Sequence, residues 1–429
     1  MNVRTGFFAL AGVALGGLLA TGADARRRPV EPVPVPSQIE QGVDMIFVDP
    51  ELRPNIPIQI MPAAGDNSPF RVEPLDEFVP LNPLFKQLRL AYEVYHRRWG
   101  SLPGIILPPG PPLSKGSNGP RVVMLRQRLG LSAGDQFDTA LDAKVRDFQK
   151  VHGLSVDGIA AGKTFGALNL FPRHYELRLI ANLERAKRLP APGRFRRYIV
   201  IDAASSELTM VENGKAVGKM KVGVGTPESP TPMMAAMIRF ISVNPYWNVP
   251  ADLAQTLIAP KVLAQGISYL TERHYQLLSD WTEDAVQVDP ARVDWQRVAQ
   301  RRQSVRLRRD PSPGNSMGTM KFMLPNDYGI YLHDYPDKSL FAKDARWVSN
   351  GCVRLENANR LAKWLTGKVP AIGGQPEKRV DLHQPVPVYM TYLTAVPTAT
   401  GVQFRPDTYG RDRKVLFNYY HAQVPIGAF

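Results

Sequence analysis

The stretch Tyr331-Leu-His-Asp-Tyr-Pro336, followed by Ser349-Asn-Gly-Cys-Val-Arg354, decides how this sequence is interpreted. His333 lies where an expected strand ends, and Cys352 follows Gly351, which lets the backbone turn tightly. A thiol becomes a nucleophile when a nearby imidazole takes its proton, and aimed backbone N–H groups stabilise the oxyanion that its attack creates. The pattern therefore predicts Cys352 as a nucleophile, His333 as its base, and a turn whose amides face a bound carbonyl.

Cys352 is the one cysteine among 429 residues, so the chain cannot form an intramolecular disulfide. A lone thiol in an oxidising compartment either reacts as part of its function or lies buried as a small apolar group. The amphipathic run 355–365 behind it predicts a helix that ends at Gly367. We expect a thiol at the entrance to that helix to have a lowered pKa, because the unpaired amides there favour the thiolate. A buried cysteine beside a satisfied histidine remains the alternative.

The residues around this stretch have the two-residue period of β-strands. Strands are expected over 198–201, 207–211, 217–224, 238–243, 329–332 and 386–393. They predict a mostly antiparallel β domain over residues 197–429. Within it, residues 251–316 form a polar, helix-prone insertion, and an insertion of that length is typical of a lid over a site.

Ahead of the β domain the apolar residues have the period of helices. Residues 114–170 contain stripes for three short helices, with Gly153 and Gly158 marking turns. The flanking segments 84–113 and 171–196 predict a helical scaffold.

The first 25 residues have the pattern of a cleaved secretory signal, with Arg4, an apolar run over 6–20 and the cleavage site Ala23-Asp24-Ala25. An uncleaved anchor is the alternative. Residues 26–83 are proline-rich and predict extended chain. No later segment is long and apolar enough to span a bilayer, so we expect a periplasmic protein without a transmembrane anchor after cleavage. The net charge of +14 favours an anionic partner in the envelope, and no nucleic-acid-binding motif is present.

Two sets of motifs resemble known families. The segments 121–129, 145–149 and 153–158 are similar to the small three-helix peptidoglycan-binding domain, which here either binds its ligand or only supports its neighbour. His333 and the run 349–354 resemble the signature of the YkuD-type L,D-transpeptidase catalytic domain, a histidine followed later by Ser/Thr-x-Gly-Cys-x-Asn/Arg.

The resemblance extends over most of the chain from about residue 84. Further matching motifs lie at 231–232, 244–250, 321–325, 332–334 and 409–412. They look like the large periplasmic subfamily, which also carries a peptidoglycan-binding domain and a capping insertion. The implied fold class is multidomain α+β, with a mostly antiparallel β-sandwich catalytic domain, a helical capping insertion and a small three-helix domain. No metal or organic cofactor is implied.

The resemblance implies that Cys352 attacks the carbonyl of the third stem residue, meso-diaminopimelate, in a peptidoglycan tetrapeptide, while His333 moves protons. The terminal D-alanine leaves and a thioester results. A second stem then gives a 3–3 cross-link, which links the chain to cell wall biogenesis and cell shape, and a lysine of an envelope protein gives a tethered protein. Carbapenems are expected to acylate the same thiol, because they resemble activated acyl donors.

Several neighbours of the pair are candidate site residues. Arg354 either holds a substrate carboxylate through its bidentate fork or pins the loop, and we prefer the second interpretation. Ser349 either donates to the oxyanion or caps the turn. Tyr331, Trp247 and Asn248 are candidates for the pocket wall, although aromatic side chains on strands more often lie in a core.

Two residues depart from the commonest family pattern. Asn350 stands where a histidine is usual, and Asp334 stands where glycine is frequent. Neither change removes the cysteine or the histidine. The imidazole of His333 is then oriented either by the backbone carbonyl of Asp334 or by its side chain.

Two rival functions are left open by the motifs. The same thioester released by water makes an L,D-carboxypeptidase, or an amidase that cuts existing bridges. The second rival is a non-catalytic peptidoglycan-binding scaffold, and the intact His333, Gly351, Cys352 and Arg354 argue against it.

Overall fold

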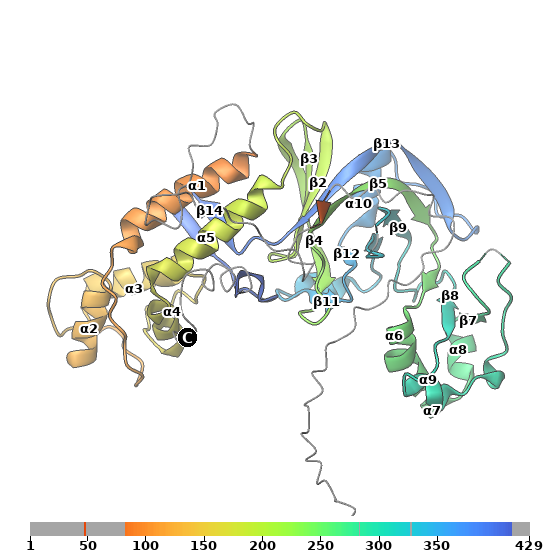
Figure 1. The fold of residues 1–429 in the computed structure, drawn as a ribbon, viewed down its shortest axis with the longest axis horizontal. Helices are drawn as coiled ribbons and strands as arrows, with labels where there is room; N and C mark the ends of the chain where they lie inside the picture. Colours follow the sequence, from red (N-terminus) through yellow and green to blue (C-terminus); the bar gives the residue numbers. More distant parts are fainter. Residues whose placement is uncertain (1–46, 49–81, 283, 327, 414–429) are drawn as a thin grey trace, which may run out of the picture. The chain divides into compact units, whose positions relative to one another are not determined.

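The computed structural model describes residues 47–48, 82–282, 284–326 and 328–413 (Figure 1). The expected signal peptide and nearly all of the proline-rich segment lie outside these residues. Helices dominate up to residue 187 and strands dominate after it, as the change of period predicts.

The elements of the helical part are β1 (Phe47–Val48), α1 (Pro83–Tyr95), η2 (His96–Gly100), α2 (Pro120–Arg128), α3 (Thr139–Val151), α4 (Gly162–Asn169) and α5 (Phe171–Lys187). The strands and helices that follow are β2 (Arg197–Asp202), β3 (Glu207–Glu212), β4 (Lys215–Gly225), β5 (Met234–Val243), β9 (Met320–Met323), β10 (Leu332–Asp334), η5 (Lys338–Ala342), β11 (Trp347–Ser349), β12 (Val353–Leu355), α10 (Ala358–Thr366), β13 (Lys378–Thr391), β14 (Ala395–Thr398) and β15 (Gly401–Phe404). The insertion between β5 and β9 contains β6 (Trp247–Asn248), α6 (Ala251–Leu253), η3 (Ala254–Ile258), α7 (Ala259–Gln265), α8 (Ser268–Glu272), β7 (Tyr275–Leu278), η4 (Pro290–Arg292), α9 (Trp295–Ala299) and β8 (Arg306–Arg309).

The main sheet closes on itself. Its hydrogen-bonded order is β1-β5-β13-β2-β3-β4-β12-β10-β9, and β9 also pairs with β5. Most pairings are antiparallel, as expected, but β13–β2, β10–β12 and β11–β4 are parallel. The strands from β5 round to β9 therefore form one hydrogen-bonded circuit, and the division into two packed sheets that the family resemblance implies stays a prediction.

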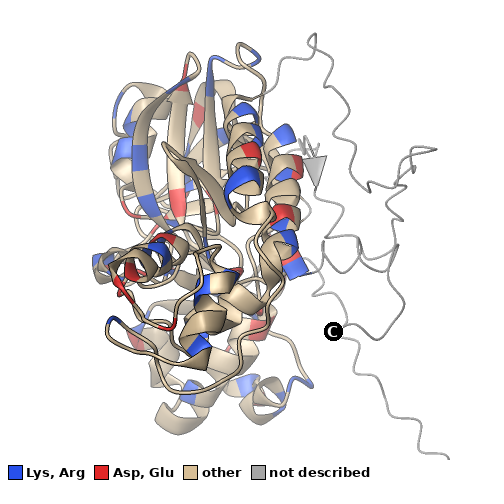
Figure 2. Ribbon diagram, turned by 90° about the vertical axis from the view of Figure 1, so that its left-hand side faces the viewer, with Lys and Arg blue, Asp and Glu red and all other residues tan. Residues whose placement is uncertain are grey.

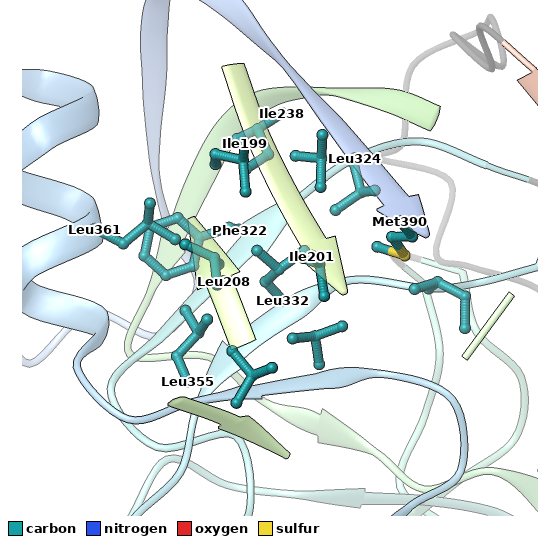
Figure 3. Packing of buried hydrophobic residues seen from close by; sticks show 14 of the residues in the cluster. Ile199, Ile201, Leu208, Ile238, Phe322, Leu324, Leu332, Leu355, Leu361 and Met390 are labelled. Carbon is teal, nitrogen blue, oxygen red and sulfur yellow. The ribbon is translucent and has the colours of Figure 1, made fainter. Parts of the chain in front are cut away.

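The apolar core of this part lies on one face of the strands. Side chains two residues apart on a strand share a face, so Ile199 and Ile201 of β2 point into the same cluster. Phe322, Leu332 and Leu355 of β9, β10 and β12 join them (Figure 3). Each of the five is fully buried. The residues that alternate with these core positions on β9, β10 and β12 therefore point to the opposite face of the sheet.

The insertion has an apolar core of its own. Trp247 of β6, Tyr275 of β7, Leu307 of β8 and Trp295 of α9 are buried in one cluster, which is separate from the core of the main sheet. The short sheet β6-β8-β7 joins these elements. An independent core is what allows an insertion of this length to hold its shape.

The helical part has a third core. Leu88 of α1, Leu125 of α2, Leu141 of α3 and Leu168 of α4 are fully buried in it, and α5 packs along α1 (Figure 1). The hairpin β14–β15 contributes Ala395, Val402 and Phe404 to the same cluster, although it comes from the far end of the chain. The helical core is thus assembled from two stretches of the sequence, 85–186 and 395–404.

A buried ion-pair network lies between α5 and the segment after β15. Asp412 accepts hydrogen bonds from Arg178 Nε at 2.8 Å, from Arg185 Nη1 at 2.6 Å and from Thr394 Oγ1 at 2.6 Å. The Asp412 side chain is 3% exposed. Buried charges are tolerated when they are paired in this way.

Charge is spread over the described residues. Lys and Arg positions occur on strands and on helices alike (Figure 2), so the net charge of +14 is not carried by a single element. Within the described ranges, no helix is both long enough and apolar enough to cross a membrane.

Candidate active site

Strand register brings the predicted residues onto one face. His333 of β10 pairs with Arg354 of β12, and Leu332 pairs with Val353. Leu332 and Val353 point into the core, so the side chains of His333 and Arg354 lie on the opposite face. By the same alternation Cys352 shares the face of Arg354. The chain thus presents the thiol and the imidazole on the same side of two neighbouring strands.

Tyr331 shares this face with His333. Their ring centroids lie 5.8 Å apart with an interplanar angle of 62°. Tyr331 also packs against two apolar clusters, that of the main sheet and that of the insertion.

The imidazole of His333 is oriented by the backbone. Its Nδ1 lies 2.6 Å from the carbonyl oxygen of Asp334, and because a carbonyl only accepts, Nδ1 carries the hydrogen. The other ring nitrogen, Nε2, is therefore the one that can take a proton. Burial, followed by the charge of Arg354, lowers the pKa of His333 to about 3, so the ring is neutral at physiological pH.

The carboxylate of Asp334 has other partners. Its Oδ2 accepts hydrogen bonds from the backbone N–H and the hydroxyl of Thr319, each at 3.0 Å, and its Oδ1 accepts one from Lys338 Nζ at 2.8 Å. Of the two interpretations left open by the sequence, the geometry thus selects the carbonyl of residue 334 as the group that orients His333.

The environment of Cys352 corrects one expectation. Cys352 is followed directly by strand β12, and the helix α10 begins only at Ala358. Burial raises the pKa of Cys352 to about 11, and hydrogen bonds from Tyr331 offset this only in part. The prediction of a pKa lowered by a helix entrance is therefore wrong, because the three residues of β12 and the two that follow them separate the thiol from the helix. The thiol and the imidazole are both neutral at rest.

Hydrogen bonds hold the turn before the cysteine. The Ser349 hydroxyl donates to the Cys352 carbonyl at 2.6 Å and accepts from the Gly351 N–H at 3.3 Å. Ser349 therefore caps the turn, and the Gly351 amide is not aimed at a substrate carbonyl. Gly351 has φ +109°, a conformation that favours glycine, and an added Cβ would lie 3.0 Å from the side chain of Ile330. Asn350 is exposed.

Thr231, which was not among the predicted site residues, stabilises this turn through hydrogen bonds. Thr231, which is fully buried, donates its hydroxyl to the Gly351 carbonyl at 2.8 Å and accepts from the Gly225 N–H at 2.9 Å. The segment after β15 reaches the same place, because Tyr409 donates to the Gly225 carbonyl and Arg411 donates to the Thr231 carbonyl. In the sequence Thr231 appears only as part of a matching motif, with nothing to mark its role.

Arg354 stands beside the thiol. Its guanidinium carbon lies 4.3 Å from the centroid of the Tyr335 ring, and its buried Nε has no hydrogen-bond partner among the described residues. Burial lowers the pKa of Arg354, although Tyr335 and Cys352 act against that change. A partly buried cation whose Nε is unpaired fits an anionic ligand better than a role as a pin for the loop.

Lys321 and Glu377 were missed by the sequence reasoning. Lys321 of β9 pairs with His333 across the sheet, and its Nζ lies 3.0 Å from Glu377 Oε1. Lys321 is 8% exposed. In the sequence, the one indication of a role for Lys321 was a charged residue between two apolar residues, Met320 and Phe322, in a short strand.

The two pocket-wall candidates of the insertion lie in its small sheet. Trp247 is buried in the insertion core, with its ring 6.3 Å from that of Tyr275. Asn248 pairs with Arg308, and its buried Oδ1 has no hydrogen-bond partner in the part of the chain that the structure describes. Tyr331 packs against the cluster that contains Trp247, so the insertion contacts the site through that tyrosine. Within the described segments, no group of three or more His, Cys, Asp or Glu side chains is arranged to hold a metal ion.

Comparison with known proteins gives two domain matches. Residues 196–388 match the model of the L,D-transpeptidase catalytic domain, and residues 119–168 match that of a putative peptidoglycan-binding domain. A putative L,D-transpeptidase of Haemophilus influenzae is 30% identical over 246 residues, which cover 56% of this chain and 48% of that protein. The chain thus spans about half the length of this curated relative.

Solved structures also match, at lower similarity. An L,D-transpeptidase from Mycobacterium smegmatis is 14% identical, with 46% of this chain and 58% of that chain covered and a TM-score of 0.24. L,D-transpeptidase 3 from Mycobacterium tuberculosis, in complex with a faropenem-derived adduct, is 15% identical, with coverage of 46% and 60% and a TM-score of 0.23. TM-scores of this size support no conclusion about the fold. Residues 196–388 are thus similar to the L,D-transpeptidase catalytic domain, and residues 119–168 ahead of them are similar to a putative peptidoglycan-binding domain.

Proposed function

We propose that this chain transfers peptidoglycan stem peptides through a thioester on Cys352. The observation that carries the proposal is the shared face of β10 and β12, on which Cys352, Tyr331, His333 and Arg354 lie together, with the reactive Nε2 of His333 left available by the bond from Nδ1 to the Asp334 carbonyl. A neutral thiol beside a neutral imidazole is a pair suited to attack that is coupled to proton transfer.

In the first step, Sγ of Cys352 attacks the carbonyl carbon of the third stem residue while His333 Nε2 takes the thiol proton. His333 then gives that proton to the nitrogen of the leaving D-alanine, and the C–N bond breaks. Arg354 holds a carboxylate of the donor stem, which would give a partner to its buried Nε, an atom with no hydrogen bond among the described residues. Excluding water from this partly buried site strengthens that contact.

In the second step an amine takes the acyl group from Cys352. The amine of a second stem gives a 3–3 cross-link, and a lysine of an envelope protein gives a tethered protein. Water gives a tripeptide and makes the chain a carboxypeptidase. We favour the stem amine, because a domain that matches peptidoglycan-binding modules over 119–168 would keep a second stem at high local concentration.

We also propose that the chain acts in the periplasm. The apolar run over 6–20 and the small residues Ala23 and Ala25 support export with cleavage. The mass of the protein recovered from a periplasmic fraction tests this: a chain that begins near Arg26 is expected, and the full-length mass would contradict cleavage.

The function is tested by mass spectrometry of disaccharide-tetrapeptides after incubation with the native protein and with Cys352→Ala. Dimers that lack one D-alanine, formed only by the native protein, are the expected result. Tripeptide monomers alone would make the chain a carboxypeptidase. An unchanged substrate in both samples, with peptidoglycan still retained in a pull-down, would support a scaffold and contradict the proposal.

A further inference from the structure

Resting on the proposed function, we propose that Glu377 binds the ammonium group of the acceptor before it attacks the thioester on Cys352. Glu377 lies just before β13. Its contact with Lys321 places its carboxylate on the side of the sheet that carries Cys352 and His333. The proposal adds an acceptor-specificity residue to a site whose other charged side chains are suited to the donor.

The position of Lys321 fixes that of Glu377. Lys321 pairs with His333 on one side and with Ser242 of β5 on the other, while its neighbour Phe322 points into the core. The Lys321 side chain therefore shares the face of His333. It is 11% exposed, and its Nζ lies 3.0 Å from Glu377 Oε1. Glu377 is in this way held at the edge of the reactive face.

One oxygen of Glu377 remains available. Oε1 accepts from Lys321, and among the described residues no hydrogen bond reaches Oε2. The side chain is 30% exposed, so a ligand can approach it. The backbone of Glu377 has φ +50°, which is unusual for a residue with a side chain, and its N–H donates to the Asn244 carbonyl at 2.9 Å. A left-handed conformation costs about 1 kcal/mol or more and persists where the surroundings impose it, often at functional sites.

Lys321 and Tyr331 connect Glu377 to the thiol of Cys352. Lys321 Nζ lies 5.9 Å from the ring centroid of Tyr331, and the Tyr331 hydroxyl hydrogen-bonds to Cys352. The charge of Glu377 acts on Tyr331, and the charge of Lys321 acts on Cys352. An ammonium at Glu377 would therefore stand on the Tyr331 side of the thioester.

The charges of the face favour such a group. Arg354 and Lys321 both act on the thiol, and Arg354 repels an ammonium while it attracts the carboxylates of a stem, whereas the charge of Lys321 is balanced by its ion pair with Glu377. Asp334 also acts on His333, but both its oxygens are occupied by Thr319 and Lys338. Glu377, with Oε2 available, is the carboxylate that can receive a cation there.

The chemical step follows from that position. The acceptor binds as an ammonium and loses one proton to solvent, which leaves a neutral amine beside the thioester. Its nitrogen attacks the carbonyl carbon, the C–N bond forms and the C–S bond breaks. The second proton passes from the nitrogen through His333 Nε2 to Sγ, so that the thiol is restored and the amide is neutral.

The experiment separates acceptor use from thioester formation in the full chain. Disaccharide-tetrapeptide serves as donor. Isotopically labelled disaccharide-tripeptide, which has no fourth residue to release, serves only as acceptor, and its label distinguishes it from the unlabelled tripeptide that hydrolysis of the donor produces. Imipenem acylation of the intact protein, followed by mass, reports on the thiol and the histidine alone. The variants are Glu377→Gln, the shorter carboxylate Glu377→Asp, and the control Asp381→Asn, which removes an exposed carboxylate that lies on β13, close to Glu377 in sequence, and pairs with Arg379.

For Glu377→Gln we expect the ratio of dimers to hydrolysed tripeptide to fall about tenfold, because one charge-assisted contact with the acceptor is lost. The rate of imipenem acylation should stay within about twofold of that of the native protein. Raising the tripeptide concentration should restore dimers, because the defect is in acceptor binding. Glu377→Asp should keep an intermediate ratio, and Asp381→Asn should match the native protein.

Two outcomes would overturn the inference. An unchanged ratio in Glu377→Gln would exclude Glu377 as the acceptor group, and a parallel loss of acylation and dimers would show that it acts only by supporting Lys321. A native protein that imipenem acylates but that forms no dimers would instead refute the proposed transpeptidation, so the two failures are distinguishable. Unfolding midpoints of the variants identify any loss of folding.

Discussion

The Nδ1 atom of His333 lies 2.6 Å from the carbonyl oxygen of Asp334, while the Asp334 carboxylate contacts Thr319 and Lys338. The direction of the imidazole is therefore set by the main chain. Any residue at position 334 offers the same carbonyl, which explains how aspartate can stand where glycine is frequent in the family.

Asp334→Asn should leave the chemistry of the thiol nearly intact. We expect the rate of imipenem acylation to stay within about threefold of native, because the asparagine keeps the backbone carbonyl and an oxygen for Thr319. His333→Ala should reduce the rate by about 100-fold or more, the usual contribution of a general base. A loss of similar size in Asp334→Asn would mean that the carboxylate orients the ring after all.

Cys352 should react slowly with simple alkylating reagents. Burial raises the pKa of its thiol to about 11 from an ordinary value near 9, so at neutral pH the thiolate fraction is about 100-fold lower than that of a free thiol. The iodoacetamide rate, followed by intact mass, should rise about tenfold per pH unit through the alkaline range. A plateau near pH 7 would reveal a thiolate paired with an imidazolium, contrary to a His333 pKa of about 3.

Thr231→Val should weaken the turn before the nucleophile. The substitution keeps the shape of the side chain but leaves the Gly351 carbonyl and the Gly225 N–H without their partner, which costs about 1–3 kcal/mol. We expect acylation by imipenem to slow, with peptidoglycan retention unchanged. Thr226→Val is the matched control, since Thr226 lies in the same loop but is not fully buried. Equal rates in the two variants would remove Thr231 from any positioning role.

Asp412→Asn should destabilise the chain. Its carboxylate pairs with Arg178 and Arg185 in a buried site, and removal of one partner from such a network costs about 3–5 kcal/mol. Burial acts to raise the pKa of Asp412, but the charges of Arg185 and Arg178 outweigh it and the pKa is lowered. A lowered carboxylate pKa contributes stability above the unfolded value of about 3.9, and that contribution is lost as the pH falls through the folded pKa.

Unfolding in urea at several pH values measures this effect. The difference in free energy of unfolding between the native protein and Asp412→Asn should be largest at neutral pH and should decrease below about pH 4. Asp407→Asn is less suitable as a comparison, because that carboxylate caps the backbone of the same segment. Asp381→Asn, in an exposed pair, should change stability by less than about 1 kcal/mol. A difference that stays constant with pH would contradict the role of charge at Asp412.

The sequence predicted several of the strands and the two main site residues, but not the short strands and the strand pairing around them. The two-residue period located β2, β3 and β4, and the short motif singled out Cys352 and His333, but the pairing of β10 with β12 that puts them on one face was not predicted. Strand β12 (Val353–Leu355) was not predicted, and its last residue was assigned to the helical run 355–365, because three residues are too few for a period to be recognised.

The pairing of strands far apart in the chain could not be predicted. Lys321 lies next to His333 only because β9 pairs with β10, and Glu377 reaches Lys321 only because β13 follows β5 in the sheet. Trp247 lies in the core of the insertion, a place that depends on which elements pack together. Such contacts follow from tertiary packing, which a local pattern of residues does not contain.

The hairpin β14–β15 has a consequence for the order in which the molecule matures. Phe404 is buried among Tyr95 and Tyr175, residues that emerge from the ribosome more than two hundred positions earlier. The apolar surface of α1 and α5 that contacts this hairpin therefore stays uncovered until β14 and β15 have been synthesised. A product that stops before residue 395 would lack the hairpin and would keep this apolar surface exposed to proteases.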